Sequence, residues 1–169
     1  GRSSARETVC RVVAGALASQ FLDQKGISVF SYVSSVGDIK LTKSYKDLDF
    51  SKIYKNEIFC PDDICALEMK KKIQEIKGMG DTIGGCVSTV IKGLPIGLGE
   101  PIYNKLNAAL SFALMSINAA KGVEFGSGFS SINMLGSAHN DLFVKKGNKI
   151  GTSTNHSGGI QGGISNGED

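Results

Sequence analysis

Long apolar runs, an excess of one charge and histidines are all scarce in this sequence, and each scarcity excludes a class of protein. The longest apolar run is far too short to span a bilayer, so we expect no membrane partner. The formal net charge is only +3, with acidic and basic residues interspersed. A nucleic-acid-binding protein needs a clustered basic face, so we expect no nucleic-acid partner either.

Metal-binding residues are equally sparse. The chain has four cysteines and two histidines, and Cys60 and Cys65 have no second Cys/His pair at the spacing of a zinc site. We therefore expect no metal site and interpret the cysteines as reduced, buried or partly buried thiols of a cytosolic-type protein. His139 and His156 are interpreted as surface or loop histidines.

The chain of 169 residues, 41% of them apolar, is long enough for a single domain with a hydrophobic core. It begins with Gly1 and Arg2 rather than with methionine, and no signal peptide is visible. We expect either a processed protein or a piece of a longer chain. Residues 42–57, in which lysines and acids alternate with apolar residues, are predicted to form a surface excursion.

Apolar residues recur at helical spacing in three segments, which predicts helices over residues 4–22, 62–77 and 102–117. Gly26 is placed to end the first helix. Each apolar stripe is expected to be buried on a shared sheet. The stripes are Val9, Val12, Val13, Ala16, Leu17 and Phe21 in the first helix, Ile64, Leu67, Ile73 and Ile76 in the second, and Leu106, Leu110, Ala113, Leu114 and Ile117 in the third.

Residues rich in β-branched and aromatic side chains predict strands over 27–36, 86–91 and 123–125. Residues 146–148 are predicted to form the tip of a hairpin. Because the connections that follow the strands are long and irregular, a parallel doubly wound sheet is disfavoured. We predict an α+β fold in which helices are layered between antiparallel sheets.

The start of the first predicted helix carries the chemistry of an anion site. Ser4 and Glu7 have capping-box spacing. Arg2, Ser3 and Arg6 add guanidinium and hydroxyl donors at the positive end of the helix dipole, where phosphate is favoured. A capped surface helix with solvated arginines remains an equally good interpretation.

Residues 154–167 alternate glycine pairs with single apolar and small polar residues. Each glycine disfavours a helix by about 1 kcal/mol relative to alanine. A glycine backbone can approach a flat or anionic ligand closely, because no Cβ is in the way. The alternative is a flexible linker, but Ile160 and Ile164 need burial, which a serine-glycine linker would not provide.

Several stretches together resemble the chorismate synthase family, in the order in which that family has them and over the whole chain. The stretches are residues 1–8 (GRSSARET), 60–62 (CPD), 80–85 (GDTIGG), 97–101 (GLGEP), 116–124 (SINAAKGVE) and 154–167 (TNHSGGIQGGISNG). The resemblance implies a sandwich of long helices between antiparallel sheets, assembled as a homotetramer. It also implies a lyase of the shikimate pathway, which serves aromatic amino acid biosynthesis. This lyase removes phosphate and a proton from 5-enolpyruvylshikimate-3-phosphate with reduced FMN as cofactor.

The resemblance also assigns binding residues. Its pattern implies FMN contacts for Arg2, Ser3, Ser4, Asn118, Ala119 and Gly162. It implies substrate contacts for Ser4 and Arg6.

The family's two acid–base histidines precede this part of the sequence, so no catalytic residue is expected here and the isolated 169-residue chain should be inactive. Ser157 stands where the family usually has alanine. The compartment is expected to be the cytoplasm, with a plastid not excluded. The alternative function is a non-catalytic module that binds a phosphate-bearing ligand or has a structural role.

Overall fold

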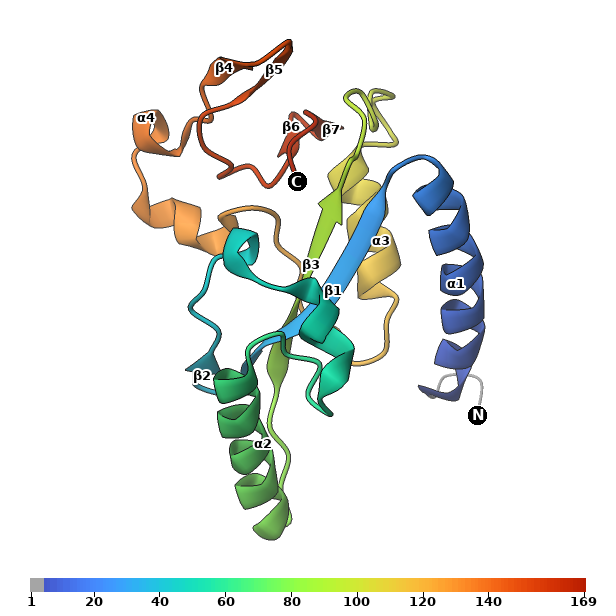
Figure 1. The fold of residues 1–169 in the computed structure, drawn as a ribbon, viewed down its shortest axis with the longest axis vertical. Coiled ribbons are helices and arrows are strands. Elements are labelled where there is room, and N and C mark those ends of the chain that lie inside the picture. The colour runs from blue at the N-terminus through green and yellow to red at the C-terminus, as the bar shows by residue number, and fades with distance from the viewer. Residues whose placement is uncertain (1–4) are drawn as a thin grey trace. The chain divides into compact units, whose positions relative to one another are not determined.

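The computed structural model describes residues 5–169, which form two compact units, one of residues 29–91 and one of residues 5–28 with 92–169 (Figure 1). The expectation of a single domain stays a prediction. No helix within the described range is long and apolar enough to cross a bilayer.

The first unit is built on a three-stranded sheet of β1 (Ser28–Val36), β2 (Ile39–Lys40) and β3 (Gly85–Lys92), in the order β2-β1-β3. The β1–β2 pair is antiparallel. Side-chain hydrogen bonds join Ser31 and Thr89, and the hydroxyl of Ser88 donates to that of Ser34. The partner number in β3 falls as the residue number in β1 rises, so β1 and β3 also run antiparallel. The predicted strands over 27–36 and 86–91 are confirmed.

Helix α2 (Asp63–Gly78) begins where the sequence predicts it. The carboxylate of Asp62 caps it by accepting the backbone N–H groups of Ile64 and Cys65 at 3.1 and 3.0 Å. These bonds and the ammonium group of Lys43 lower the pKa of Asp62. The residue therefore stays ionised at the positive end of the helix dipole.

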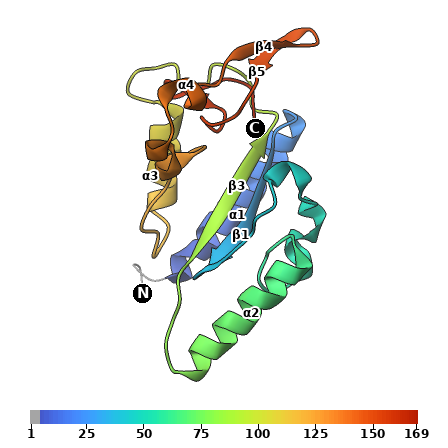
Figure 2. The same cartoon turned by 90° about the vertical axis from the view of Figure 1, so that its left-hand side faces the viewer.

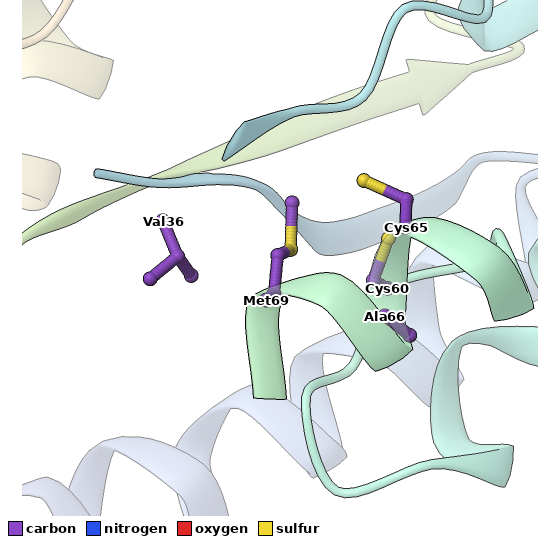
Figure 3. Close-up of a cluster of buried hydrophobic side chains, with 5 residues drawn as sticks. All are labelled: Val36, Cys60, Cys65, Ala66 and Met69. Atoms are coloured by element: carbon purple, nitrogen blue, oxygen red, sulfur yellow. The ribbon is translucent and has the colours of Figure 1, made fainter. Parts of the chain in front are cut away.

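The buried face of α2 is not the predicted one. Ile64 and Leu67 are 75% and 55% exposed, whereas Cys65, Ala66 and Met69 are buried. Figure 3 shows these three side chains grouped with Val36 and Cys60, and Figure 2 shows α2 beside the sheet. The prediction was wrong because apolar residues occur on both sides of this helix. The smaller side chains Cys65 and Ala66 are the ones that face the strands.

Residues 42–57 carry two 3-10 helices, η2 (Tyr45–Asp47) and η3 (Phe50–Lys55). Ile53 is 1% exposed and belongs to a core cluster with Tyr32 and Val90. The ring of Phe50 stacks on that of Phe30 with centroids 4.6 Å apart. Part of this segment therefore covers the sheet.

The second unit begins with a 3-10 turn, η1 (Ala5–Glu7), followed by α1 (Thr8–Gln24). The backbone N–H groups after α1 donate to its last carbonyls, and Gly26 adopts φ +73°, as predicted for a C-terminal glycine.

The prediction that the α1 stripe is buried is wrong within this chain. The helix has no buried residue, and the valine, leucine and phenylalanine side chains of its stripe are 58% to 70% exposed. Helix α3 (Leu106–Met115) also has no buried residue. Its leucines are half-buried, and Ile117 beyond its end is 44% exposed. No element of the described chain covers the stripe of α1.

The rest of this unit consists of short elements. They are η4 (Gly128–Asn133), α4 (Gly136–His139), β4 (Phe143–Lys146), β5 (Lys149–Thr152), β6 (Ile160–Gln161) and β7 (Ile164–Ser165). The β4–β5 and β6–β7 pairs are antiparallel hairpins, and the predicted hairpin tip at 146–148 is confirmed. The strand predicted over 123–125 is absent, because this segment makes turn contacts and no ladder. The predicted α+β class is confirmed.

The core beneath α2 can be tested with Met69→Ala. Met69 has no exposed surface, so we expect the free energy of unfolding to fall by about 2–5 kcal/mol. The exposed Lys71 on the same helix offers a control, since Lys71→Ala should change it by no more than about 0.5 kcal/mol. Urea unfolding of both variants provides the comparison. Equal losses would contradict the buried face described above.

Candidate functional site

The glycine-rich segment ends in a two-residue hairpin turn. Ile160 pairs with Ser165 and Gln161 with Ile164, which leaves Gly162 and Gly163 at the tip. Both have positive φ, +61° and +82°, the conformation of a type I′ turn that favours glycine. A Cβ on Gly163 would lie 2.7 Å from the side chain of Lys105, whereas a Cβ on Gly162 would meet nothing within 4 Å. The backbone of Gly162 is therefore open to a ligand.

The carboxylate of Asp141 holds the segment that precedes this hairpin. Asp141 is 2% exposed. It accepts the hydroxyl of Thr154 at 2.6 Å and the backbone N–H groups of His156 and Ser157 at 2.8 Å each. Burial alone would raise its pKa, but the bonds from Thr154, Ser157 and His156 lower the pKa to about 2. The ionised carboxylate thus fixes the path of residues 154–157.

A cavity of about 300 Å³ lies beside the hairpin. Most of the side chains around it are polar, and the backbone at the turn is bare. It is lined by Asn107, Phe125, Gly128, Ser131, His139, His156, Ser157, Ile160, Gly162 and Gly163. The volume is at the lower end of the range for small-molecule sites.

The two histidines of the chain meet at this cavity. The rings of His139 and His156 stack with centroids 5.5 Å apart and an angle of 26° between their planes. Nδ1 of His156 lies 3.2 Å from the hydroxyl of Ser127, with which it shares a hydrogen bond. The two imidazoles therefore form part of the wall of the same cavity.

The predicted phosphate-binding helix start lies partly outside the described residues, because Arg2, Ser3 and Ser4 precede them. Arg6 is exposed in the 3-10 turn before α1, rather than within the α-helix. Further along, the guanidinium of Arg11 donates to both the hydroxyl and the carbonyl of Ser116, each at 2.9 Å. This fork joins the first part of α1 to the end of α3.

Asn118 and Ala119 follow directly after α3, next to this fork. Ala119 has φ +64°, which is uncommon for a residue with a Cβ and marks a constrained backbone. Gly163 lies at the opposite end of α3, where its carbonyl accepts the N–H of Leu106 at 2.7 Å. The ten residues of α3 span about 15 Å. The structure therefore brings Asn118 and Ala119 close to α1 but separates them from Gly162 along α3.

Sequence reasoning missed Asp141, the histidine pair and Arg11. The hydrogen-bonding partners of Asp141 are 13 to 16 residues away in the sequence, so no local spacing reveals them. Among residues 5–169, no group of three or more histidine, cysteine, aspartate or glutamate side chains is arranged to hold a metal ion.

Antiparallel sheets and separate helices, with a bare glycine turn beside a polar cavity, define an α+β protein. The family profile described as chorismate synthase matches residues 1–169. The chain belongs to the chorismate synthase family.

Individual relatives agree with this assignment. The chain is 57% identical to "Chorismate synthase" of Bacteroides thetaiotaomicron over 169 residues, which are 100% of this chain and 47% of that protein. It is 59% identical to "Chorismate synthase" of Christiangramia forsetii, over 100% of this chain and 46% of that protein. The solved structure "Crystal Structure of Chorismate Synthase" matches with a TM-score of 0.90 and 31% identity, covering 98% of this chain and 54% of that one. The chain thus spans about half the length of the curated relatives it matches.

The anchoring role of Asp141 can be tested with Asp141→Asn. Removing the charge should lower the free energy of unfolding by about 1–3 kcal/mol at neutral pH. The pKa of about 2 lies below the ordinary value of 3.8, so the carboxylate stabilises the fold fully above about pH 4 and loses this effect as the pH falls toward 2. The difference between wild type and variant should shrink over that range in urea unfolding. The exposed Asp38 serves as control, and an equal loss in Asp38→Asn would contradict the assignment.

Proposed function

We propose that the protein is a chorismate synthase, a carbon–oxygen lyase that eliminates phosphate and a proton from 5-enolpyruvylshikimate-3-phosphate with reduced FMN. The observation that carries the proposal is the similarity to proteins of that name along the whole chain. This similarity also disfavours a non-catalytic module. We place the enzyme in the cytoplasm as part of the same proposal.

The residues present are suited to a flavin. Arg2, Ser3 and Ser4 would bind FMN from the start of the chain, and Asn118 and Ala119 from the end of α3. Gly162 would lie against the flat ring system, which its open surroundings permit. When bound, reduced FMN supplies electron density as the phosphate leaves the substrate. The polypeptide would orient both molecules and exclude water.

Ser4 and Arg6 would bind the substrate through its anionic groups. General acid–base groups typically contribute about 10²–10⁴-fold in rate, and the family's histidines for this role lie outside the sequence described here. We therefore propose that the isolated 169-residue chain has no measurable lyase activity.

A homo-oligomer, a tetramer by resemblance, is supported by the exposed surface of the chain. Its accessible area is 11,889 Å². A folded monomer of 17.8 kDa exposes about 8,000 Å², and counting the two units as separate particles raises this only to roughly 9,500 Å². The excess is comparable to an obligate interface, which typically buries about 2,000–5,000 Å². The remainder of the family's length and further copies would share this surface.

The flavin contact at the hairpin can be tested with Gly162→Asn. Asparagine tolerates positive φ, so the fold should survive while the new side chain occupies the open space at the turn. We expect the affinity of the full-length protein for FMN to fall roughly tenfold or more, as measured by fluorescence titration.

Gly147→Asn is a matched control, because Gly147 also has φ +61° and open space at its Cβ position, but in the β4–β5 turn. Its FMN affinity should equal that of the wild type. Unchanged affinity in Gly162→Asn would remove Gly162 from the flavin site.

The substrate contact can be tested with Arg6→Ala and Arg6→Lys in the full-length protein. Arg6→Ala should weaken substrate binding or turnover roughly ten- to hundred-fold, the effect of losing a charge-assisted bond. Arg6→Lys should not behave conservatively, because lysine lacks the planar fork of donors. Steady-state kinetics and thermal unfolding should be measured together, with Lys25→Ala at the far end of α1 as control. Wild-type kinetics in Arg6→Ala would refute the substrate role.

A further inference from the structure

Three sulfur-bearing side chains are buried together at the start of α2. Cys60 and Met69 have no exposed surface, and Cys65 is 8% exposed. All three belong to the core cluster that also contains Val36 and Ala66, and Figure 3 shows them grouped there. Aliphatic side chains of similar volume would fill the same space equally well. The cluster therefore has a chemical property besides its packing, because it gathers three soft donor atoms in one core.

The two thiols are held against each other. The side chains of Cys60 and Cys65 share a hydrogen bond. The side-chain amide of Asn56 donates to the carbonyl of Cys60 at 2.7 Å and accepts its N–H at 3.3 Å. The N–H of Cys65 donates to the capping carboxylate of Asp62 at 3.0 Å. Both backbones are thus fixed on either side of the helix start, which brings the sulfurs together before any ligand binds.

Met69 adds a third sulfur on the same side of the helix. It follows Cys65 by four residues, the spacing at which side chains on an α-helix are neighbours. Its thioether accepts but carries no proton, so it can contribute to a ligand set without changing the charge. Spacing rules for zinc sites consider cysteine and histidine and pass over such a thioether.

The number and type of these donors select among metal ions. Thiolate and thioether ligands favour Cu(I), zinc or iron–sulfur clusters. Structural zinc takes four nitrogen or sulfur ligands, and iron–sulfur clusters are typically held by four cysteines. Within residues 5–169 no group of three or more histidine, cysteine, aspartate or glutamate side chains could complete either set. Cu(I) is the soft ion of this group that sulfur ligands satisfy at a lower coordination number.

The position at the helix start suits the charge of such a complex. Cu(I) bound by two thiolates carries one net negative charge, and each thiol releases its proton to solvent as the ion binds. Cys65 lies in the first turn of α2, where the positive end of the helix dipole stabilises negative charge. Burial, with the neighbouring Cys60, raises the pKa of Cys65 to about 11. The thiol therefore stays protonated at neutral pH until a strongly thiophilic ion replaces the proton.

We propose that Cys60, Cys65 and Met69 bind one Cu(I) ion, with the two thiolates and the thioether as its ligands. The site belongs to residues 29–91. None of the residues proposed to bind FMN or substrate lies in that unit, so the inference does not depend on the proposed function.

The experiment is a titration of the full-length protein with Cu(I), freed of flavin and kept without oxygen, against a chromophoric Cu(I) chelator. The wild type should retain one equivalent of Cu(I) more than Cys60→Ala or Cys65→Ala. Loss of an outer-shell partner already lowers metal affinity about 10–100-fold, so loss of a thiolate should lower it about 100-fold or more. Met69→Leu conserves the core volume and should lower the affinity about tenfold.

Cys10→Ala and Cys86→Ala are matched controls, because each removes one exposed thiol. Both should bind Cu(I) as the wild type does. Equal losses in these controls, or no loss in Cys60→Ala and Cys65→Ala, would overturn the proposal.

X-ray absorption of the Cu(I)-loaded protein tests the ligand set in a way that does not depend on stability. We expect a shell of sulfur alone, with three ligands in the wild type and two in Met69→Leu. A shell containing nitrogen or oxygen would overturn the proposal, as would recovery of Cys60 and Cys65 as a disulfide without bound metal. Thermal unfolding of the metal-free variants shows that each remains folded. Should an alanine variant fail to fold, Met69→Leu still decides, because an unchanged affinity and sulfur shell in it would refute the ligand set.

Discussion

The described chain buries little apolar surface by itself, and this limit determines which forces hold each of its two units together. Of the hydrophobic residues buried within the described range, all but Ile27 belong to residues 29–91. There α2 and η3 cover the sheet with side chains such as Met69 and Ile53. The other unit carries the long apolar stripe of α1, which no part of the described chain covers. Hydrophobic burial therefore organises one unit, and the other must be held by different forces.

Polar groups take that role around the glycine hairpin. Asp141, Thr152 and Ser165 are each 2% exposed. Ser165 donates its hydroxyl to the carbonyl of Pro95 and accepts the N–H of Leu98, which ties the loop before α3 to β7. A single such bond contributes only about 0.5–1.5 kcal/mol, but together the bonds fix a backbone that has no apolar core beneath it. A hairpin held this way can present bare glycine to a ligand without a covering side chain.

Local sequence patterns predicted where the helices and turns lie better than they predicted which side of each helix is buried. Helical spacing located all three long helices. Gly26 was predicted to end the first helix and residues 146–148 to form a hairpin tip, and the structure confirms both. The buried side of α2 was not predictable, since Cys65 and Ala66 give a weaker apolar signal than Ile64 and Leu67. The cavity was not predictable either, because it depends on contacts between residues far apart in sequence, as His139 and His156 illustrate.

A polar contact also connects α1 to the segment that follows α3. Arg11 of α1 donates two hydrogen bonds to Ser116, the residue directly after α3. A planar guanidinium that makes two bonds fixes orientation as well as distance. Ala119, with φ +64°, lies three residues beyond Ser116, so the fork constrains the backbone that leads to it. The segment after α3 is therefore held by a polar contact with α1, in the same way that the bonds of Asp141 and Ser165 hold the segment around the hairpin.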